Sequence, residues 1–341
     1  MIQDAIQKLV HRDGLTQQEA YDAMSEIMDG RATAVQIAAF LVALRLKGES
    51  VEEIVGCARV MREKATRIKV NRASLIDTCG TGGDAAGTFN VSTASAIVAS
   101  GAGCSVAKHG NRAVSSRCGS ADVLSALGVN IEMSPREAEL CLEEIGITFL
   151  YAPLLHGAMK YAAPVRKELG LRTIFNILGP LTNPAGAQRQ LLGVYGPEWT
   201  GPVASVLGVL GSEHALVVHG EGGMDEISHT GDTQVSEWRN GEVRTYKISP
   251  GTYGIERGSV HQILGGSAEE NAGIIREVLD GKDGAPRDVV LLNSGAAIVV
   301  AGLAGSLQEG IEMASYSIDS GAAKRKLRDF VEASQVDRHV S

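Results

Sequence analysis

Residues 1–70 carry apolar side chains at helical spacing and almost no strand pattern. Three helix starts are marked by capping boxes, in which a hydroxyl side chain and a Glu or Gln three positions later satisfy free backbone N–H groups. These boxes are Thr16 with Glu19, Thr33 with Gln36, and Ser50 with Glu53. Apolar residues recur at intervals of three and four, as in Ile37, Phe40, Leu41 and Leu44. With the segment Ile2 to Val10, the pattern predicts four short helices and a small all-helical domain.

From about residue 72, short β-rich runs alternate with helical stretches, which predicts a mostly parallel central sheet. We therefore expect residues 71–341 to form a large α/β domain. A proline- and glycine-rich stretch at residues 163–186 favours a hinge with a helical contribution to the small domain. The segment 234–248 alternates polar and apolar residues around Asn240-Gly241 and predicts an antiparallel hairpin. The other predicted strands are Leu75–Thr78, Cys104–Lys108, Val129–Glu132, Ile147–Tyr151, Leu191–Tyr195 and Ala215–His219.

Composition and charge narrow the function. The formal net charge of −8 argues against a nucleic-acid partner, because such binding normally needs a basic face. There is no apolar core of signal-peptide length at the N-terminus and no apolar run of roughly 18 residues, so we expect a cytoplasmic protein with no membrane partner. The five cysteines are scattered, without zinc-site spacing, and are predicted to be free thiols.

A glycine-rich segment, Asp77 to Asp84, directly follows a predicted strand. Its glycines let the backbone approach a ligand closely, and consecutive N–H groups can point at one oxyanion. Asn90, Ser92 and Thr93 stand where the next helix is predicted to begin and add further donors for negative charge. The segment predicts a phosphate cradle, and the alternative is a glycine-rich turn with ordinary capping residues.

The same residues match the loose dinucleotide-binding pattern G-x-G-x-x-A through Gly80, Gly82 and Ala85. Such a site needs an acidic residue roughly 20 positions further on, at the end of the next strand. This chain has Lys108-His109 at the end of that strand, and its helix begins about ten residues after Gly80, too late for the fingerprint. A P-loop is excluded because no G-x-x-x-x-G-K-[ST] run occurs.

A second loop, Lys108 to Ser120, follows the next predicted strand and carries three cations among glycine and hydroxyl residues. This mixture suits a ligand with two or three negative charges, although a solvated basic loop is the alternative. Both loops stand at the carboxyl ends of predicted neighbouring strands, where ligands of parallel sheets bind.

Two further features complete the candidate site. Asp225 and Glu226 are adjacent carboxylates in a glycine loop, which suits Mg²⁺ because this ion prefers oxygen ligands; a solvated acidic loop is the alternative. Arg166, near the proline-containing hinge, could hold a carboxylate in a bidentate fork, and a surface ion pair is the alternative.

In this order, the segments resemble those of the anthranilate phosphoribosyltransferases, over nearly the whole chain. The resemblance rests on Gly80–Asp84, Asn90–Thr93, Lys108–Arg112 with Ser115-Ser116, Gly223–Glu226 and, most specifically, Arg172–Pro184. It implies the architecture shared with pyrimidine nucleoside phosphorylases and a homodimer contacting through the helical domains. The implied reaction transfers phosphoribosyl from 5-phosphoribosyl 1-pyrophosphate (PRPP) to the amine of anthranilate, with Mg²⁺, in tryptophan biosynthesis.

The resemblance also implies roles for individual residues. Ser92, Asp225 and Glu226 would hold Mg²⁺, while Asn111 and Arg166, with the backbone at Gly80, would hold anthranilate. Its route would be lined by His109, His156 and Pro180. The donor would be bound by Gly80, Gly83, Asp84, Thr88, Asn90, Val91, Ser92, Thr93, Lys108, His109, Gly110, Asn111, Arg112, Ala113, Val114, Ser115, Ser116 and Ser120.

Two other classes of protein are weighed against this one. A pyrimidine nucleoside phosphorylase of the same architecture would use free phosphate and would need neither a pyrophosphate cradle nor the Asp225–Glu226 pair. A non-catalytic regulator that binds nucleotides or nucleic acid is disfavoured by the net charge of −8 and by the complete set of loops.

Overall fold

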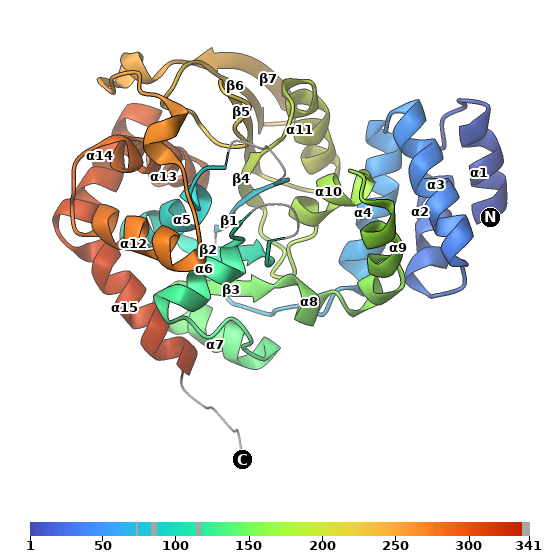
Figure 1. The fold of residues 1–341 in the computed structure, drawn as a ribbon, viewed down its shortest axis with the longest axis horizontal. Helices are drawn as coiled ribbons and strands as arrows, with labels where there is room; N and C mark the ends of the chain where they lie inside the picture. The colour runs from blue at the N-terminus through green and yellow to red at the C-terminus, as the bar shows by residue number, and fades with distance from the viewer. Residues whose placement is uncertain (73, 83–86, 114–116, 336–341) are drawn as a thin grey trace.

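The computed structural model describes residues 1–72, 74–82, 87–113 and 117–335. At the N-terminus, four helices form a bundle at one end of the molecule (Figure 1). They are α1 (Ile2–Val10), α2 (Gln17–Met28), α3 (Ala34–Lys47) and α4 (Val51–Lys64). Three short helices follow later in the chain, α8 (Ala152–Leu155), α9 (Ala163–Leu169) and α10 (Ile174–Leu178), and the last two pack against α3 and α4. The stretch 163–186 is thus mainly short helices and turns that join the bundle to the sheet.

The predicted capping boxes are all present. In the first, Glu19 N donates to Thr16 Oγ1 at 3.2 Å while Thr16 N donates to Glu19 Oε2 at 3.0 Å. The boxes that begin α3 and α4 are closed in the same reciprocal way. These helix starts were predictable because a capping box satisfies its backbone groups within four residues and needs no tertiary contact.

A seven-stranded sheet forms the centre of the remaining chain, in the order β3-β2-β1-β4-β5-β6-β7. The first five strands in that order are parallel, and β6 and β7 form the predicted antiparallel hairpin. The strands are β1 (Leu75–Gly80), β2 (Ser105–Gly110), β3 (Ile147–Tyr151), β4 (Arg189–Gly193), β5 (His214–Gly220), β6 (Thr233–Arg239) and β7 (Glu242–Ile248).

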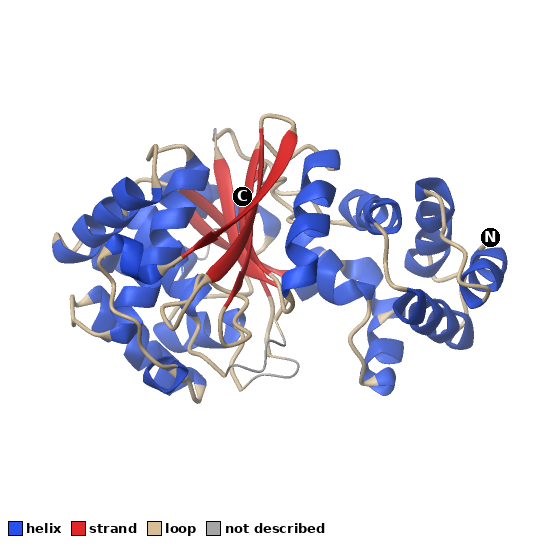
Figure 2. Cartoon of the chain, turned by 90° about the horizontal axis from the view of Figure 1, so that it is seen from above, coloured by secondary structure: helices blue, strands red, loops and turns tan. Residues whose placement is uncertain are grey.

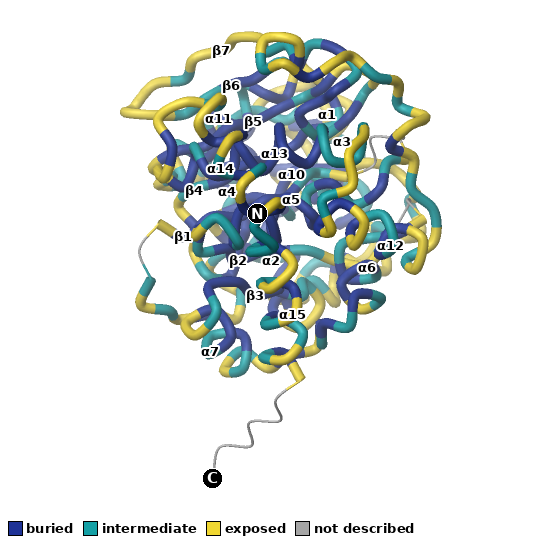
Figure 3. Tube along the Cα trace, turned by 90° about the vertical axis from the view of Figure 1, so that its left-hand side faces the viewer, coloured by how far each residue is buried: buried dark blue, intermediate teal, exposed yellow. Residues whose placement is uncertain are grey.

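Helices cover both faces of this sheet (Figure 2). The α-helices of this part are α5 (Val91–Gly101), α6 (Ser120–Leu127), α7 (Pro135–Ile145), α11 (Thr200–Val209), α12 (Ala268–Leu279), α13 (Ala285–Ala301), α14 (Leu307–Asp319) and α15 (Ala322–Gln335). Short 3₁₀ turns occur at Gly157–Tyr161, Gly179–Leu181, Pro197–Trp199, Pro250–Tyr253 and Val260–Ile263. The inner strands are buried, whereas the edge strand β7 is largely exposed (Figure 3). The predicted architecture, a small helical part plus an α/β part with a mostly parallel sheet, is confirmed.

Two apolar cores flank the sheet. One lies between the sheet and helices α5, α12, α13, α14 and α15, and includes Ile76, Val106 and Val218. The other begins in the bundle and continues through α10 and α11 onto the opposite sheet face at Leu192 and Val217. Because this second core runs without a break from the bundle to the sheet, the domain boundary near residue 70 stays a prediction.

The strand predicted at Val129–Glu132 is wrong. Val129 and Ile131 are buried, as their apolar character requires, but the segment is irregular. Two of its N–H groups donate to side chains, Asn130 N to Ser334 Oγ at 3.0 Å and Glu132 N to Asn130 Oδ1 at 3.0 Å, while Val129 N donates to Leu124 O at 3.0 Å. The alternating apolar residues of this segment therefore indicate that its side chains are buried, but not that its backbone pairs with a strand.

Among the described residues, no helix combines the length and the apolar character needed to cross a membrane.

Candidate active site

The carboxyl ends of β1, β4 and β5 bring the glycine-rich segment and the two carboxylates together. Thr81 N donates to Gly193 O at 2.9 Å, which joins the segment after β1 to the end of β4. Gly82 N donates to Asp225 Oδ2 at 2.9 Å, and Ser92 N at the start of α5 donates to Glu226 Oε1 at 3.2 Å. Residues more than a hundred positions apart in the chain thus meet where the sequence analysis placed the donor site.

The loop that carries the carboxylates crosses directly over two glycines. A Cβ on Gly80 would lie 2.4 Å from Asp225 Oδ2, and a Cβ on Gly193 would lie 1.4 Å from Asp225 O. Both distances are far below van der Waals contact. At Gly193 the obstacle is the backbone of the loop, so this position requires glycine for the loop to pass, whereas at Gly80 the obstacle is the end of the Asp225 side chain. The glycine-rich pattern predicts close ligand approach at Gly80 and predicts no role for Gly193.

Asp225, Glu226 and Ser92 offer only oxygen atoms, which are the ligands that Mg²⁺ prefers. Within the described part of the chain, no cluster of three or more His, Cys, Asp or Glu side chains is suited to hold a metal ion. Two carboxylates and a hydroxyl nevertheless fit Mg²⁺, because this ion usually keeps several waters and binds substrate phosphates.

Lys108 lies next to the point where the carboxylate loop meets Ser92, and not in an open loop. Its side chain is buried, and its Nζ donates to the Thr78 carbonyl and, at 3.2 Å, to Ser92 Oγ. Asp77, also buried, accepts from His109 N at 3.1 Å and from Asn183 Nδ2 at 2.8 Å. Burial lowers the pKa of Lys108 and raises the pKa of Asp77, and the attraction between the two opposite charges opposes both shifts. A cation is thereby held next to Ser92.

The second loop is organised by Asp122, which the sequence analysis missed. Its Oδ2 accepts from Ala113 N and Gly119 N, both at 2.9 Å, and its Oδ1 pairs with Arg112 Nη1 at 2.9 Å. Arg112 therefore has a protein partner. Asp122 could have been noticed from sequence as the third residue of α6, where a carboxylate serves backbone N–H groups at the helix start.

Asn90 does not cap α5 with its side chain. Its Nδ2 donates to Cys118 O at 3.2 Å, and its Oδ1 accepts from Nδ2 of the buried Asn271 at 2.9 Å. Asn90 thus ties the start of α5 to the second loop. Thr93 is buried, and its hydroxyl makes no hydrogen bond within the described residues.

Of the remaining residues predicted to bind the donor, some are described by the structure and others are not. Thr88 is half-buried and lies in an isolated bridge with Leu264, and Ser120 Oγ donates to Asn111 O at 3.3 Å. Val91 is buried at the start of α5, and Gly110 ends β2. Predictions for Gly83, Asp84, Val114, Ser115 and Ser116 lie outside the described residues.

On the predicted acceptor side, His109 and His156 form a buried pair, with their Nε2 atoms 3.2 Å apart. Burial lowers the pKa of His109 to about 3 and that of His156 to about 4. The backbone of Gly179, next to Pro180, hydrogen-bonds to His109 and partly opposes its shift. The three residues predicted to line the anthranilate route are therefore neighbours. Arg166 lies over the Phe175 ring, with its Cζ 5.0 Å from the ring centroid.

Acidification is expected to destabilise the fold because both histidines are buried in the neutral state. Their folded-state pKa values, about 3 and about 4, lie below the unfolded value of 6.5, so the unfolded chain gains protons first as the pH falls. Stability present above pH 6.5 should decline towards pH 4, by up to roughly 1.4 kcal/mol per pH unit for each histidine. Urea unfolding from pH 7 to pH 4 would measure this slope. His156→Gln should reduce the dependence of the unfolding free energy on pH. An unchanged slope would contradict the destabilisation assigned to this buried neutral histidine.

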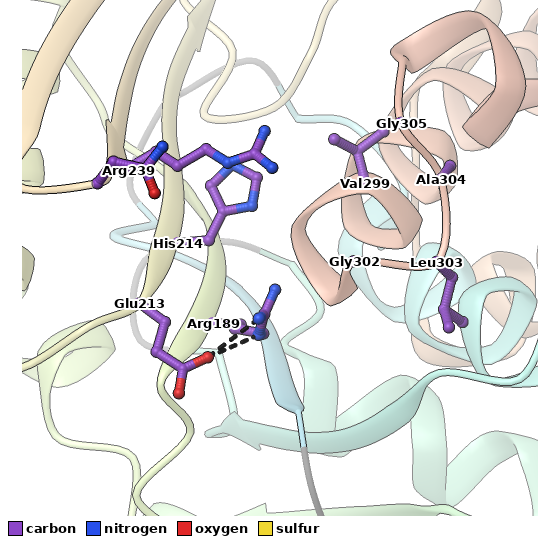
Figure 4. A pocket seen from close by; sticks show the side chains of 10 residues that line it. Arg189, Glu213, His214, Arg239, Val299, Gly302, Leu303, Ala304 and Gly305 are labelled. Atoms are coloured by element: carbon purple, nitrogen blue, oxygen red, sulfur yellow. Dashed lines mark hydrogen bonds and ion pairs between the residues drawn. The ribbon is translucent and has the colours of Figure 1, made fainter.

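A cavity of about 450 Å³ lies at the opposite, amino-terminal end of the strands, between Arg189, His214 and residues 302–305 (Figure 4). Arg189 pairs with Glu213 at 3.0 Å and donates to Val300 O at 2.8 Å. His214 Nε2 lies 2.8 Å from Glu237 Oε1. Because these groups are paired within the protein, we assign the cavity no role.

Comparison with known proteins agrees with this geometry. Residues 72–324 match the model of the glycosyl transferase family α/β domain, and residues 3–65 match that of its helical bundle domain. Anthranilate phosphoribosyltransferase from Anaeromyxobacter sp. is 56% identical over 336 residues, covering 98% of this chain and 99% of the relative. The enzyme of that name from Acetivibrio thermocellus is 55% identical, covering 97% of this chain and 96% of the relative.

Solved structures give the same result. The crystal structure of anthranilate phosphoribosyltransferase from Thermus thermophilus matches with a TM-score of 0.92 and 45% identity, covering 97% of this chain and 99% of that chain. The Saccharomyces cerevisiae enzyme in complex with PRPP and Mg matches with a TM-score of 0.90 and 29% identity, covering 98% and 97%. Fold and site thus define a glycosyl transferase built from a helical bundle and an α/β domain. The chain belongs to the anthranilate phosphoribosyltransferase family, as its sequence motifs indicated.

Proposed function

We propose that this protein transfers the 5-phosphoribosyl group of PRPP to the amine of anthranilate, releasing pyrophosphate, in tryptophan biosynthesis. One observation carries the proposal. At the carboxyl ends of neighbouring strands, Asp225 and Glu226 contact Gly82 N and Ser92 N, directly above the buried ammonium of Lys108. Two carboxylates, a cation and a glycine-rich backbone at one point suit a multiply charged phosphate donor bound with a divalent ion.

We further propose that Asp225, Glu226 and Ser92 hold Mg²⁺. When bound, this ion would neutralise charge on the departing pyrophosphate. Lys108 would contribute positive charge from below, because its Nζ already lies 3.2 Å from Ser92 Oγ. The backbone N–H groups of the glycine-rich segment would hold phosphate oxygens.

The bond from ribose C1 to the pyrophosphate oxygen breaks as the bond from the anthranilate nitrogen to C1 forms, and the nitrogen then releases a proton to water. The arylamine is already neutral at pH 7, so positioning matters more than a strong base. The low pKa values of His109 and His156 support this view, since an uncharged pair fits the route of an aromatic substrate.

Arg166→Ala should raise the KM for anthranilate about 10- to 150-fold and leave the KM for PRPP nearly unchanged. A charge-assisted hydrogen bond to a carboxylate contributes about 1.5–3 kcal/mol, which corresponds to this range. Initial rates with each substrate varied in turn would measure it. Lys167→Ala removes the exposed neighbouring cation and serves as the control. Equal effects of Arg166→Ala on both KM values would contradict a contact with anthranilate.

The decisive test follows the fluorescence of anthranilate in the presence of PRPP and Mg²⁺. We expect a decrease that needs both additions. A protein that instead splits uridine or thymidine with free phosphate, and leaves anthranilate unchanged, would be a nucleoside phosphorylase.

We also propose that the protein is a homodimer that associates through the bundle. Val10 on α1 and Val35 and Leu46 on α3 are 66%, 78% and 76% exposed, and a partner bound at the bundle would remove such side chains from water. Light scattering should give twice the mass of one chain, and Leu46→Glu should lower the measured mass.

We expect the protein to act in the cytoplasm, and its five free cysteines agree with a reducing compartment.

A further inference from the structure

We propose that Asn293, in the middle of α13, is the positioning residue that fixes the carboxylate loop for Mg²⁺ and the donor. This inference rests on the proposed function, because it concerns how Asp225 and Glu226 are held and not what they bind. Asn293 lies beneath the loop and is far from it in sequence.

The Asn293 side chain makes three hydrogen bonds while it is fully buried. Its Oδ1 accepts from Ile227 N at 2.9 Å, and its Nδ2 donates to Ile227 O at 2.9 Å and to Val289 O at 2.8 Å. One amide group therefore pairs with both backbone polar atoms of Ile227, as a neighbouring strand would. The third bond fixes the side chain to its own helix.

This pairing acts on the residue that directly follows Glu226. Ile227 and Met224 are buried in the core on either side of the carboxylates, so the loop is held at both ends. On the side facing the sheet, the backbone of Asp225 passes over Gly193 without space for a Cβ. The loop is thus confined between the end of β4 and helix α13. Any shift of this loop would misplace both carboxylates together.

Only an amide of this length satisfies all three partners. Aspartate keeps the acceptor for Ile227 N but, when ionised, places negative charge against two carbonyl oxygens. Alanine leaves the N–H and both carbonyl groups without their partner in a buried setting, which is unfavourable. Residues that support metal ligands in this indirect way typically change metal affinity or activity about 10- to 100-fold when they are replaced.

Calorimetric titration of PRPP, with Mg²⁺ in excess and with Mg²⁺ removed by EDTA, tests the proposal without any turnover. For the wild type we expect Mg²⁺ to tighten PRPP binding. In Asn293→Ala and Asn293→Asp, we expect PRPP binding in Mg²⁺ to weaken about 10- to 100-fold, with little change in EDTA. If Asn293→Ala does not fold, Asn293→Asp alone shows whether Mg²⁺-dependent binding of PRPP needs the amide.

Ile298→Ala is the matched control, because Ile298 is a fully buried residue of the same helix, beyond Asn293 and away from the loop. It should lower the melting temperature while preserving the effect of Mg²⁺ on PRPP binding. The proposal is overturned if the Asn293 variants bind PRPP with Mg²⁺ as the wild type does. It is equally overturned if Ile298→Ala loses as much affinity at the same melting temperature. The proposed metal site itself fails if Mg²⁺ does not tighten PRPP binding to the wild type. It also fails if Mg²⁺ still tightens PRPP binding to the Asp225→Asn/Glu226→Gln variant.

Discussion

Replacing Asp225 by Asn and Glu226 by Gln together is expected to lower turnover by at least roughly 100-fold at saturating substrate and Mg²⁺. Both substitutions keep the shape of the side chain and remove only its negative charge. The amides can still meet the N–H groups of Gly82 and Ser92 through their carbonyl oxygens, so the loop should keep its path. Two neutral amides, however, bind a divalent cation far more weakly than two carboxylates.

A Mg²⁺ titration of the initial rate would separate metal binding from general damage. The wild-type rate should rise with Mg²⁺ and saturate, whereas the double variant should stay low or require much more of the ion. Glu221→Gln with Asp232→Asn removes the same charge from the connection between β5 and β6, where these two residues contact each other, and should leave the titration unchanged. Equal activity of wild type and Asp225→Asn/Glu226→Gln at all Mg²⁺ concentrations would contradict the assigned role.

What the sequence predicted well is structure determined within a few neighbouring residues. Each capping box joins donor and acceptor three positions apart, and the Asn240-Gly241 turn sets the β6–β7 hairpin locally. The position of the two loops after β1 and β2 was also predictable, because each is a continuous segment after a strand and parallel strands place such segments side by side; their binding of the donor stays a prediction. Strand bounds were less accurate. β4 begins at Arg189, two residues before the predicted start, because its pairing with β1 extends over residues that are not apolar.

Residues that support the site from a distance could not be predicted. Asn293 stands with Ser294 in a mostly apolar stretch of helix, and its partner Ile227 lies 66 positions away. Asn271 is likewise a buried amide whose partner, Asn90, lies 181 positions away. A single amide in one sequence carries no periodicity or spacing from which a contact could be inferred. The passage of the loop over Gly193 could not be predicted for the same reason. A glycine can indicate that there is no space for a side chain, but not which atom fills that space.

Lys108→Met is expected to have two separable effects, because the ammonium both faces the site and balances a buried charge. It should destabilise the protein by about 3 kcal/mol, since Asp77 is fully buried and loses its nearby cation. It should also lower turnover by about 100-fold or more if Lys108 stabilises charge on the departing pyrophosphate, as removal of one such donor does elsewhere. Urea unfolding measures the first effect and steady-state kinetics the second.

Adding Asp77→Asn separates these effects. In the double variant the buried negative charge is gone, and the new amide can still accept from His109 N through its carbonyl oxygen. Asn183 Nδ2 loses this acceptor but keeps the Ala107 carbonyl, so part of the lost stability should return. Turnover should not return, because no cation lies beside Ser92. If activity recovers together with stability, Lys108 acts only by balancing Asp77, and leaving-group stabilisation must then come from the carboxylate-bound ion and the backbone N–H groups.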